Sequence, residues 1–267
     1  MDATYWLKQT LQPLFPDLQW SRPENKKFAG KLLIIGGNLH GFAAPATAYQ
    51  EALKAGIGVS KVLLPDALKK TVGRILENGE YAPSTPSGSF NKQAQATWLE
   101  WAQWADAVLL AGDLGRNSET AVAIEAFTQY YKGPLTITKD AIDYFNHHAL
   151  TLLNRPQTTL VLSIAQLQKL SRQATPEHPV QFSFGLPQLV DWLHDFSQTH
   201  PANIVTYHHE TILAASQGQV STTNVGEQES WRVKTAAHAA VWWLQNLSQP
   251  LEAITVGIYE SFSKEKG

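Results

Sequence analysis

Residues 30–65, GKLLIIGGNLHGFAAPATAYQEALKAGIGVSKVLLP, decide the fold class. The first part, 30–37, is a short apolar run closed by a glycine pair, which is typical of a buried parallel strand. The segment 45–58 predicts a helix, and Pro45 suits its first turn. The segment 59–65 predicts the next strand. A strand, a helix and a strand in this order form a βαβ unit, which implies a parallel sheet.

The same alternation continues on both sides of this stretch. We expect a mostly parallel sheet with helices on both faces and with ligands at the carboxyl ends of the strands. We also expect one domain over 1–267, with 1–25 as a helical lead-in. The expected helices cover 3–12, 66–76, 92–105, 118–131 and 250–262, and the expected strands cover 106–112, 134–138, 158–163 and 203–208. The segment 210–223 predicts a hairpin that turns at Gly218, and the loop 77–90, rich in Pro, Ser and Gly, is a candidate mobile lid.

The composition argues against several classes of partner. The 267 residues are 43% hydrophobic and 16% charged, with a formal net charge of -2. This balance provides no basic surface for nucleic acid or for an anionic membrane. No apolar run approaches the ~20 residues that cross a bilayer, and the N-terminus is too polar for a secretory signal, so we expect a cytoplasmic protein. The absence of cysteine excludes disulfides and thiolate chemistry.

Glycines follow the first strand in a pattern that permits a tight turn. Gly36 and Gly41 bound a G-x4-G span, but Phe42 and Ala43 stand where a phosphate-binding P-loop needs Lys and Ser or Thr. The segment also lacks the G-x-G-x-x-G pattern of dinucleotide-binding folds. A glycine turn can approach a ligand or simply redirect the chain, and both interpretations remain open. The candidate ligand-contacting residues here are Gly36, Gly37, Asn38 and Gly41.

A second turn follows the strand 106–112, in the segment AGDLGRN at 111–117. Asp113 could contact a ligand or cap the next helix. We favour the cap, because Asp and Asn before a helix usually serve as caps. Gly115 and Arg116 are the other binding candidates of this segment.

The stretch GEQESWRVKTAAHAAVWWL, 226–244, predicts a helix with an unfavourable start. The sequence is rich in alanine from Val233 onward, but its entry carries Trp231, Arg232 and Lys234. The N-terminus of a helix has free N–H groups and a partial positive charge, which favour small capping residues and anions. The bulk and the cations therefore need an explanation from the surrounding fold.

The order of these motifs resembles the ATP- or ADP-dependent NAD(P)H-hydrate dehydratases, carbohydrate-kinase-related proteins of the ribokinase-like superfamily. The resemblance is best over 26–145, where Ala44 aligns with a substrate-contacting alanine. ADAVLLAGDLGRNSET, 105–120, resembles the family's ADAVVIGPGLGR, and PLTITKDAIDYF, 134–145, resembles PLVLDADAL with Asp140 retained and Lys139 new. The resemblance implies a ribokinase-like three-layer α/β/α fold, with ATP or ADP and Mg²⁺ as ligands.

Four site motifs of that family are altered. G-P-G-L-G has become AGDLG at 111–115, so that the Asp113 side chain occupies the place of a glycine. The H-P-G-E motif falls on SIAQ at 163–166, without a histidine, and a lysine-glycine pair aligns with Tyr207 and His208. G-G-T-G-D aligns with SWRVK at 230–234, which places Lys234 at the position of the catalytic aspartate.

These changes bear on the mechanism that the resemblance implies. In this superfamily glycine N–H groups stabilise the phosphoryl charge and the aspartate acts as a base. A lysine ammonium cannot accept a proton, so we expect an impaired or inactive relative that keeps residual nucleotide or partner binding. The alternative is an active dehydratase or small-molecule kinase in which Lys234 and Arg232 bind phosphate. The lost acid could then be replaced by an acid at another strand end, Asp106, Asp113 or Asp140. Asn224 is a further candidate for nucleotide binding.

The histidine pairs do not indicate a metal centre. Both pairs are adjacent in sequence rather than four residues apart, so neither presents two ligands on one helix face. We expect no metal bound directly by side chains of this kind. The pairs are His147–His148 and His208–His209.

Tryptophans recur at regular spacing. A stripe on one face of a helix is most simply part of the core or of an oligomer contact, and aromatic residues are enriched at interfaces. We therefore expect a homo-oligomer. The residues concerned are Trp98, Trp101 and Trp104 in one helix and Trp242 and Trp243 in another.

Overall fold

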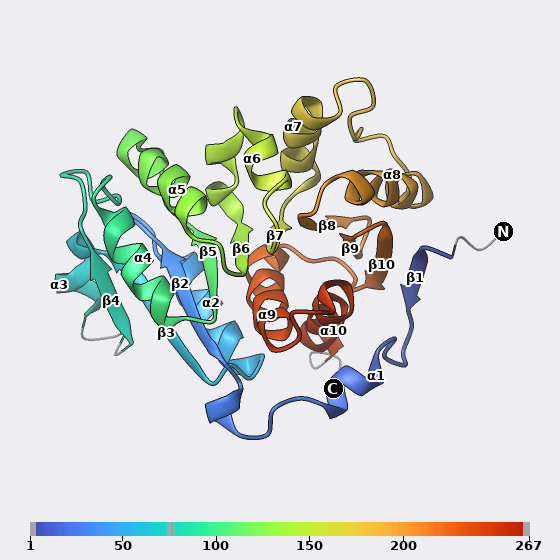
Figure 1. Cartoon of the computed structure of the whole chain (residues 1–267), viewed down its shortest axis with the longest axis horizontal. Coiled ribbons are helices and arrows are strands. Elements are labelled where there is room, and N and C mark those ends of the chain that lie inside the picture. Colours follow the sequence, from blue (N-terminus) through green and yellow to red (C-terminus); the bar gives the residue numbers. More distant parts are fainter. Residues whose placement is uncertain (1–3, 74–75, 77, 264–267) are drawn as a thin grey trace.

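A computed structural model describes residues 4–73, 76 and 78–263. Within these residues ten strands form one sheet in the order β1-β10-β9-β8-β7-β6-β5-β2-β3-β4 (Figure 1). Neighbouring strands are parallel except that β9 is antiparallel to both β8 and β10. The strands are β1 Trp6–Gln9, β2 Lys31–Gly36, β3 Val59–Pro65, β4 Gly79–Ala82, β5 Ala107–Gly112, β6 Leu135–Thr138, β7 Thr158–Val161, β8 Asn203–His208, β9 Thr211–Ser216 and β10 Gln219–Asn224.

Helices cover both faces of the sheet, as predicted. One core lies against α1, α2, α3, α9 and α10, and the other lies against α4 to α8. The helices are α1 Pro16–Trp20, α2 Ala43–Lys54, α3 Lys69–Val72, α4 Ala94–Trp104, α5 Ser118–Tyr130, α6 Ala149–Leu153, α7 Ile164–Ala174, α8 Leu186–Thr199, α9 Trp231–Gln245 and α10 Pro250–Ser263. Short 3₁₀ turns are η1 Lys26–Phe28, η2 Asp66–Leu68, η3 Lys139–Ala141 and η4 Asp143–Phe145. The molecule is a three-layer α/β/α structure.

The central strands show why the apolar runs predicted the sheet. In β2, Leu32 and Ile34 enter one core and Leu33 and Ile35 enter the other. Successive side chains of a strand point to opposite faces, so a strand covered on both sides must be apolar throughout. The hairpin prediction is also confirmed. Gln217 and Gly218 both have positive φ, as the two-residue turn of a tight hairpin requires.

The helix expected over 3–12 is wrong in the described residues, which begin at residue 4. Trp6–Gln9 forms β1, which pairs in parallel with β10. The ring of Tyr5 stacks on His194 with 3.7 Å between centroids, and Trp6 Nε1 donates to Thr222 Oγ1 at 2.9 Å. An unpaired sheet edge with these side-chain contacts outweighs the modest helix propensity of so short a segment. Residues 4–25 therefore contribute a strand and the short helix α1 rather than one long helix.

Three other expectations need correction. The helix expected over 66–76 ends at Val72, and residues 74–75 lie outside the described part. The expected lid 77–90 contains the edge strand β4 and a bridge between Ser84 and Phe90, although residue 77 itself lies outside the description. Trp242 and Trp243 are 1% and 3% exposed in this chain's own core, which leaves them no part in an interface. Trp98, by contrast, is a core residue as expected.

None of the described helices has both the length and the apolar character that a membrane span requires.

Candidate functional site

The carboxyl ends of β2 and β5 form two glycine turns in direct contact. Gly37, with φ of +85°, donates its N–H to the carbonyl of Gly112 at 3.0 Å. A Cβ on Gly36 would lie 2.6 Å from that same oxygen, and a Cβ on Gly112 would lie 2.7 Å from Cβ of Lys139. Close packing of backbone therefore accounts for these glycines, and their contact with a ligand stays a prediction.

Asn38 fastens the first turn to the second. Its backbone N–H donates to the carbonyl of Gly41 at 2.8 Å, and Gly41 returns a hydrogen bond at 3.1 Å. Its side-chain Nδ2 donates to the carbonyl of Asp113 at 2.6 Å. A Cβ on Gly41 would meet no described atom within 4 Å, so this glycine borders open space.

Asp113 caps a helix, but not the helix that follows it. Its Oδ2 accepts the N–H of Ala44, in the first turn of α2, at 2.7 Å. The following helix, α5, is capped instead by Asn117, whose side chain accepts from two N–H groups of its first turn. Asp113 therefore has a capping role, as expected, but it caps α2 and not the helix that follows it. Arg116, between these two residues, is exposed to solvent.

Lys139, at the carboxyl end of β6, is ion-paired with Asp113. Its Nζ lies 2.6 Å from Asp113 Oδ1, and the two side chains are 31% and 17% exposed. Both residues have left-handed backbone, with φ of 54° and 57°, a conformation that normally favours glycine. One carboxylate therefore links the ends of β5 and β6 to the first turn of α2.

Asp140 lies deeper at the same edge. Its Oδ2 accepts the N–H of Gly115 at 3.1 Å, while Oδ1 is buried without a hydrogen-bond partner in the described structure. Burial is the main cause that raises the pKa of this carboxyl above its usual value, and backbone N–H donors oppose the rise. The structure therefore gathers Asn38, Ala44, Asp113, Gly115 and Asp140 as one connected cluster.

The entry of α9 is closed by aromatic packing. The helix begins at Trp231, two residues before the expected start, and Trp231 is 7% exposed. Its ring centre lies 5.6 Å from that of Tyr207, whose hydroxyl donates to the carbonyl of Gly226 at 3.0 Å. Lys234 Nζ lies 4.4 Å from the ring centre of Phe262 in α10, and Arg232 is half-buried. The first residue of α9 thus packs its indole into the core.

Asn224, at the carboxyl end of β10, lines a cavity beside α10. The cavity has a volume of about 440 Å³. Its wall includes Phe262, the ring over which Lys234 lies. Asn224 and Lys234 therefore belong to the α10 side of the edge, whereas Asp113 and Asp140 belong to the glycine turns. The remaining lining residues are Gln9, Thr10, Leu11, Thr223, Val225, Tyr259 and Ser263.

The other aligned positions serve local structure. Ser163 caps α7 in a capping box with Gln166. His208 Nε2 is hydrogen-bonded to the carbonyl of Phe184 at 2.8 Å, and burial lowers the pKa of this histidine. Within the described residues no three His, Asp or Glu side chains are grouped so that they could hold a metal ion.

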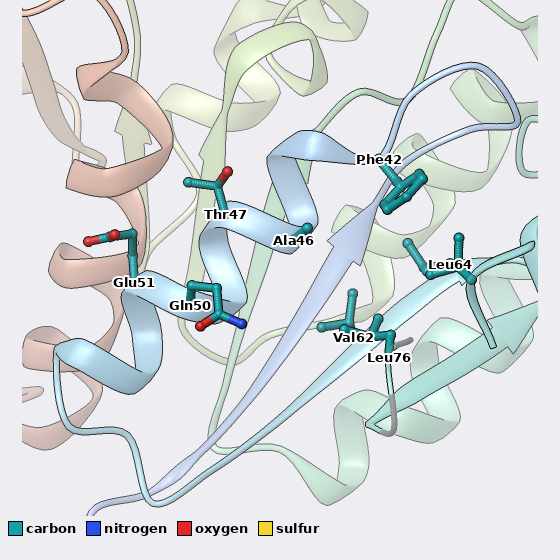
Figure 2. A pocket seen from close by; sticks show the side chains of 9 residues that line it. Phe42, Ala46, Thr47, Gln50, Glu51, Val62, Leu64 and Leu76 are labelled. Atoms are coloured by element: carbon teal, nitrogen blue, oxygen red, sulfur yellow. The ribbon is translucent and has the colours of Figure 1, made fainter. Parts of the chain in front are cut away.

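A second cavity of about 460 Å³ lies on α2 and β3 (Figure 2), and Phe42 and Leu64 of its wall also adjoin Gly37 in the first glycine turn. Glu51 on its α2 wall pairs with Lys54 Nζ at 2.6 Å and accepts from His238 Nε2 of α9 at 3.1 Å. The hydrogen bond from His238 is the main cause that lowers the pKa of Glu51 to about 2. The other lining residues are Phe42, Ala46, Thr47, Gln50, Val62, Leu64, Val72 and Leu76.

Sequence reasoning missed three residues that complete the cluster. Lys139 pairs with Asp113, and the hydroxyl of Tyr144 donates to the carbonyl of Gly115. Gln166 Nε2 donates to the carbonyl of Lys139 at 2.8 Å. The sequence did contain one signal for the ion pair: a lysine, Lys139, stands directly before Asp140 at a strand end. Neighbouring parallel strands bring their carboxyl ends together, so this lysine could be expected near Asp113.

Comparisons with known proteins agree with the architecture. No family model matches the chain. The chain is 32% identical over 117 residues to the bifunctional NAD(P)H-hydrate repair enzyme Nnr of Methanothermobacter thermautotrophicus. That match covers 42% of this chain and 22% of the relative, so the chain matches only about a fifth of that enzyme's length.

Two solved structures share the fold. A ribokinase-like superfamily protein of Enterococcus faecalis superposes with a TM-score of 0.74 at 15% identity, covering 100% of this chain and 89% of that one. The ADP/ATP-dependent NAD(P)H-hydrate dehydratase of Bacillus subtilis, crystallised with ATP and Mg²⁺, superposes with a TM-score of 0.60 at 12% identity, covering 97% and 90%. Part of the chain is therefore similar in sequence to an NAD(P)H-hydrate repair enzyme, and the whole described structure shares its fold with these ribokinase-like structures.

Proposed function

We propose that this chain is a non-catalytic relative of the NAD(P)H-hydrate dehydratases. The observation that carries the proposal is Lys234 at the position where the family resemblance places a catalytic aspartate. Its ammonium lies 4.4 Å from the ring centre of Phe262 and has no lone pair with which to accept a proton. Loss of a general base typically costs ~10²-fold or more in rate.

The residues at the sheet edge do not fit the phosphates of ATP or ADP. At the start of α9 the buried Trp231 stands where the resemblance expects a glycine whose bare backbone N–H approaches phosphate. The N–H of Ala44 in α2 is already bonded to the Asp113 carboxylate. A single unpartnered carboxylate oxygen, on Asp140, does not make a ligand set for Mg²⁺. We therefore derive no catalytic step through a nucleotide.

The test is turnover of hydrated NADH. The protein is incubated with hydrated NADH and ATP or ADP with Mg²⁺, and recovery of NADH absorbance is followed over hours. We expect a rate equal to the blank without protein. A rate above the blank that Lys234→Ala abolishes would overturn the proposal, because it would show that Lys234 works in catalysis.

A second function, an active enzyme with a rebuilt site, is favoured by one observation. Asp140 has a buried oxygen without a partner and a raised pKa, which are properties of a candidate acid or base. In that case turnover is measurable and Asp140→Asn removes it. Asp143→Asn is the matched control, because Asp143 is a neighbouring acid whose Oδ1 is already bonded to Gln166 Nε2 at 3.1 Å.

Residual ligand binding without chemistry is part of the proposal. The cavity beside Asn224 supports it, since aromatic rings and an amide line it and Lys234 lies over one of those rings. Thermal shifts with ADP and ATP, compared between the natural chain and Asn224→Ala, test this binding.

We further propose that the protein is a cytoplasmic homo-oligomer. Sedimentation velocity on the purified chain tests the oligomeric state.

A further inference from the structure

The Asp113 carboxylate is an anion that the chain itself supplies to the glycine turns. It accepts the N–H of Ala44 at 2.7 Å with one oxygen and pairs with Lys139 Nζ at 2.6 Å with the other. A backbone N–H in the first turn of a helix together with a lysine ammonium is a pair of donors that also suits a phosphate oxygen. In this chain both donors are already engaged.

Side-chain contacts hold Asp113 and Lys139 in unfavourable backbone conformations. Asp113 and Lys139 both adopt left-handed φ, which disfavours residues with a Cβ. The two strand ends are also tightly packed, because a Cβ on Gly112 would lie 2.7 Å from Lys139 Cβ and 2.8 Å from Asp140 Oδ1. The ion pair and the helix cap therefore hold two unfavourable backbone conformations in place.

The charges at this point disfavour an incoming anion. The ammonium of Lys139 pairs with Asp113 at the end of β5, and the next residue after Lys139 is a second acid, Asp140. The strands β5 and β6 that end here are neighbours in the sheet. A phosphate group would bring further negative charge next to two carboxyl groups, and it would have to displace one of them from its donors. Such a repulsive element excludes a ligand class as effectively as missing contacts do.

We propose that the Asp113–Lys139 pair is an internal plug that occupies an anion position at the carboxyl ends of β5 and β6 and excludes phosphate-bearing ligands from it. The plug explains the misfit between this edge and the nucleotide phosphates of the family. It rests on the proposed function, because an enzyme with a working phosphate site would have no such plug. It adds to that function the prediction that the site can be reopened.

The experiment uses binding rather than turnover as its readout. Isothermal titration calorimetry with inorganic pyrophosphate and with Mg·ADP compares the natural chain with Asp113→Gly, which removes the carboxylate and suits the left-handed backbone. Gln217→Gly is the matched control, because Gln217 has φ of 51° in the hairpin between β9 and β10, and its replacement relieves the same backbone conformation away from the edge. We expect at least ~10-fold tighter pyrophosphate binding by Asp113→Gly and no change in Gln217→Gly.

Further variants show whether a change in affinity comes from the lost carboxylate and the freed ammonium rather than from misfolding. Asp113→Asn keeps the size of the side chain and an acceptor for Ala44 N–H but loses the charge, and we expect binding between the two extremes. Adding Lys139→Gln to Asp113→Gly should remove the gained affinity, because it removes the freed ammonium. Equal affinity in the natural chain, Asp113→Gly and Asp113→Asn would overturn the plug. Turnover of hydrated NADH by the natural chain would instead overturn the proposed function, so the two failures are distinguishable.

Discussion

Two places where site motifs of the family are altered are filled in different ways. At the ends of β5 and β6 the filling is ionic and partly exposed, with Asp113 and Lys139 at 17% and 31% exposure. At the start of α9 it is aromatic and buried, with Trp231 at 7% exposure against Tyr207. Ionic filling can be removed at a modest cost in stability, whereas a buried indole is part of the core. The first place can therefore be reopened by one substitution, and the second cannot.

Removal of the Trp231 side chain should have the largest effect. Trp231→Ala leaves a cavity between α9 and β8, and we expect the free energy of unfolding to fall by about 3 kcal/mol. Urea denaturation followed by circular dichroism measures this change. Trp20→Ala is the control, because Trp20 is 87% exposed and should change stability little. A loss below about 1 kcal/mol would mean that the start of α9 is loosely packed and that the contrast between the two places is smaller than we infer.

Acid should destabilise the α9 side through Glu51. Its folded-state pKa of about 2 lies below the usual value of 4.5, so its stabilising contribution is present above pH 4.5 and is lost as the pH falls toward 2. The expected loss is on the order of 2 kcal/mol over this window. Denaturant unfolding at a series of pH values should show this slope in the natural chain and a smaller slope in Glu51→Gln. Equal slopes in the two proteins would mean that the pair with His238 does not stabilise the fold.

Substitution of Asp113 should have a smaller effect that depends on the replacement. Asp113→Ala loses the cap of α2 and the ion pair while keeping φ of 57°, so we expect a loss of about 1.5 kcal/mol. Asp113→Gly should recover roughly half of that loss, because glycine adopts this backbone without strain. The difference between the two unfolding free energies isolates the backbone contribution. If alanine and glycine are equal, the left-handed conformation relaxes when the carboxylate is removed.

Asp140 should show the opposite pH dependence to Glu51. Its folded-state pKa is raised, so the stability associated with its protonated form is complete below the unfolded value and is lost as the pH rises through the folded value. At pH 7, Asp140→Asn should therefore be more stable than the natural chain, with no such gain near pH 3. Melting temperatures at the two pH values give the comparison. If Asp140→Asn is instead destabilised at pH 7, the ionised carboxylate makes a stabilising interaction in the folded chain.

The fold could be predicted because its central strands are covered on both faces. Runs such as Leu32–Leu33–Ile34–Ile35 must be apolar at every position, and such runs stand out in a sequence. The N-terminal strand could not be predicted in the same way. Trp6–Gln9 is a strand only because β10 offers it an edge, and β10 lies more than two hundred residues later in the chain.

The candidate site was predicted as a set of positions, but its contacts were not. Asp113 was expected to cap the nearest helix in sequence, and it caps α2, which is separated from it in sequence by three strands. The pairing of Asp113 with Lys139 depends on the sheet order, which brings β5 beside β6. Lys234 and Trp231 stood out in the sequence as unfavourable first residues of a helix, but only the comparison with a family motif gave them a functional interpretation.

The position of β1 in the sheet has a consequence for synthesis of the chain. β1 leaves the ribosome more than two hundred residues before its partner β10, residues 219–224. Until the β9–β10 hairpin has emerged, Tyr5 and Trp6 have neither His194 nor Thr222 to contact. Pairing across so long a separation is slow, so the inner strands can assemble before β1 joins them. β1 is made before the other strands of the described sheet and is in this way the last of them to find its place, so a nascent chain carries it unpaired until β10 has emerged.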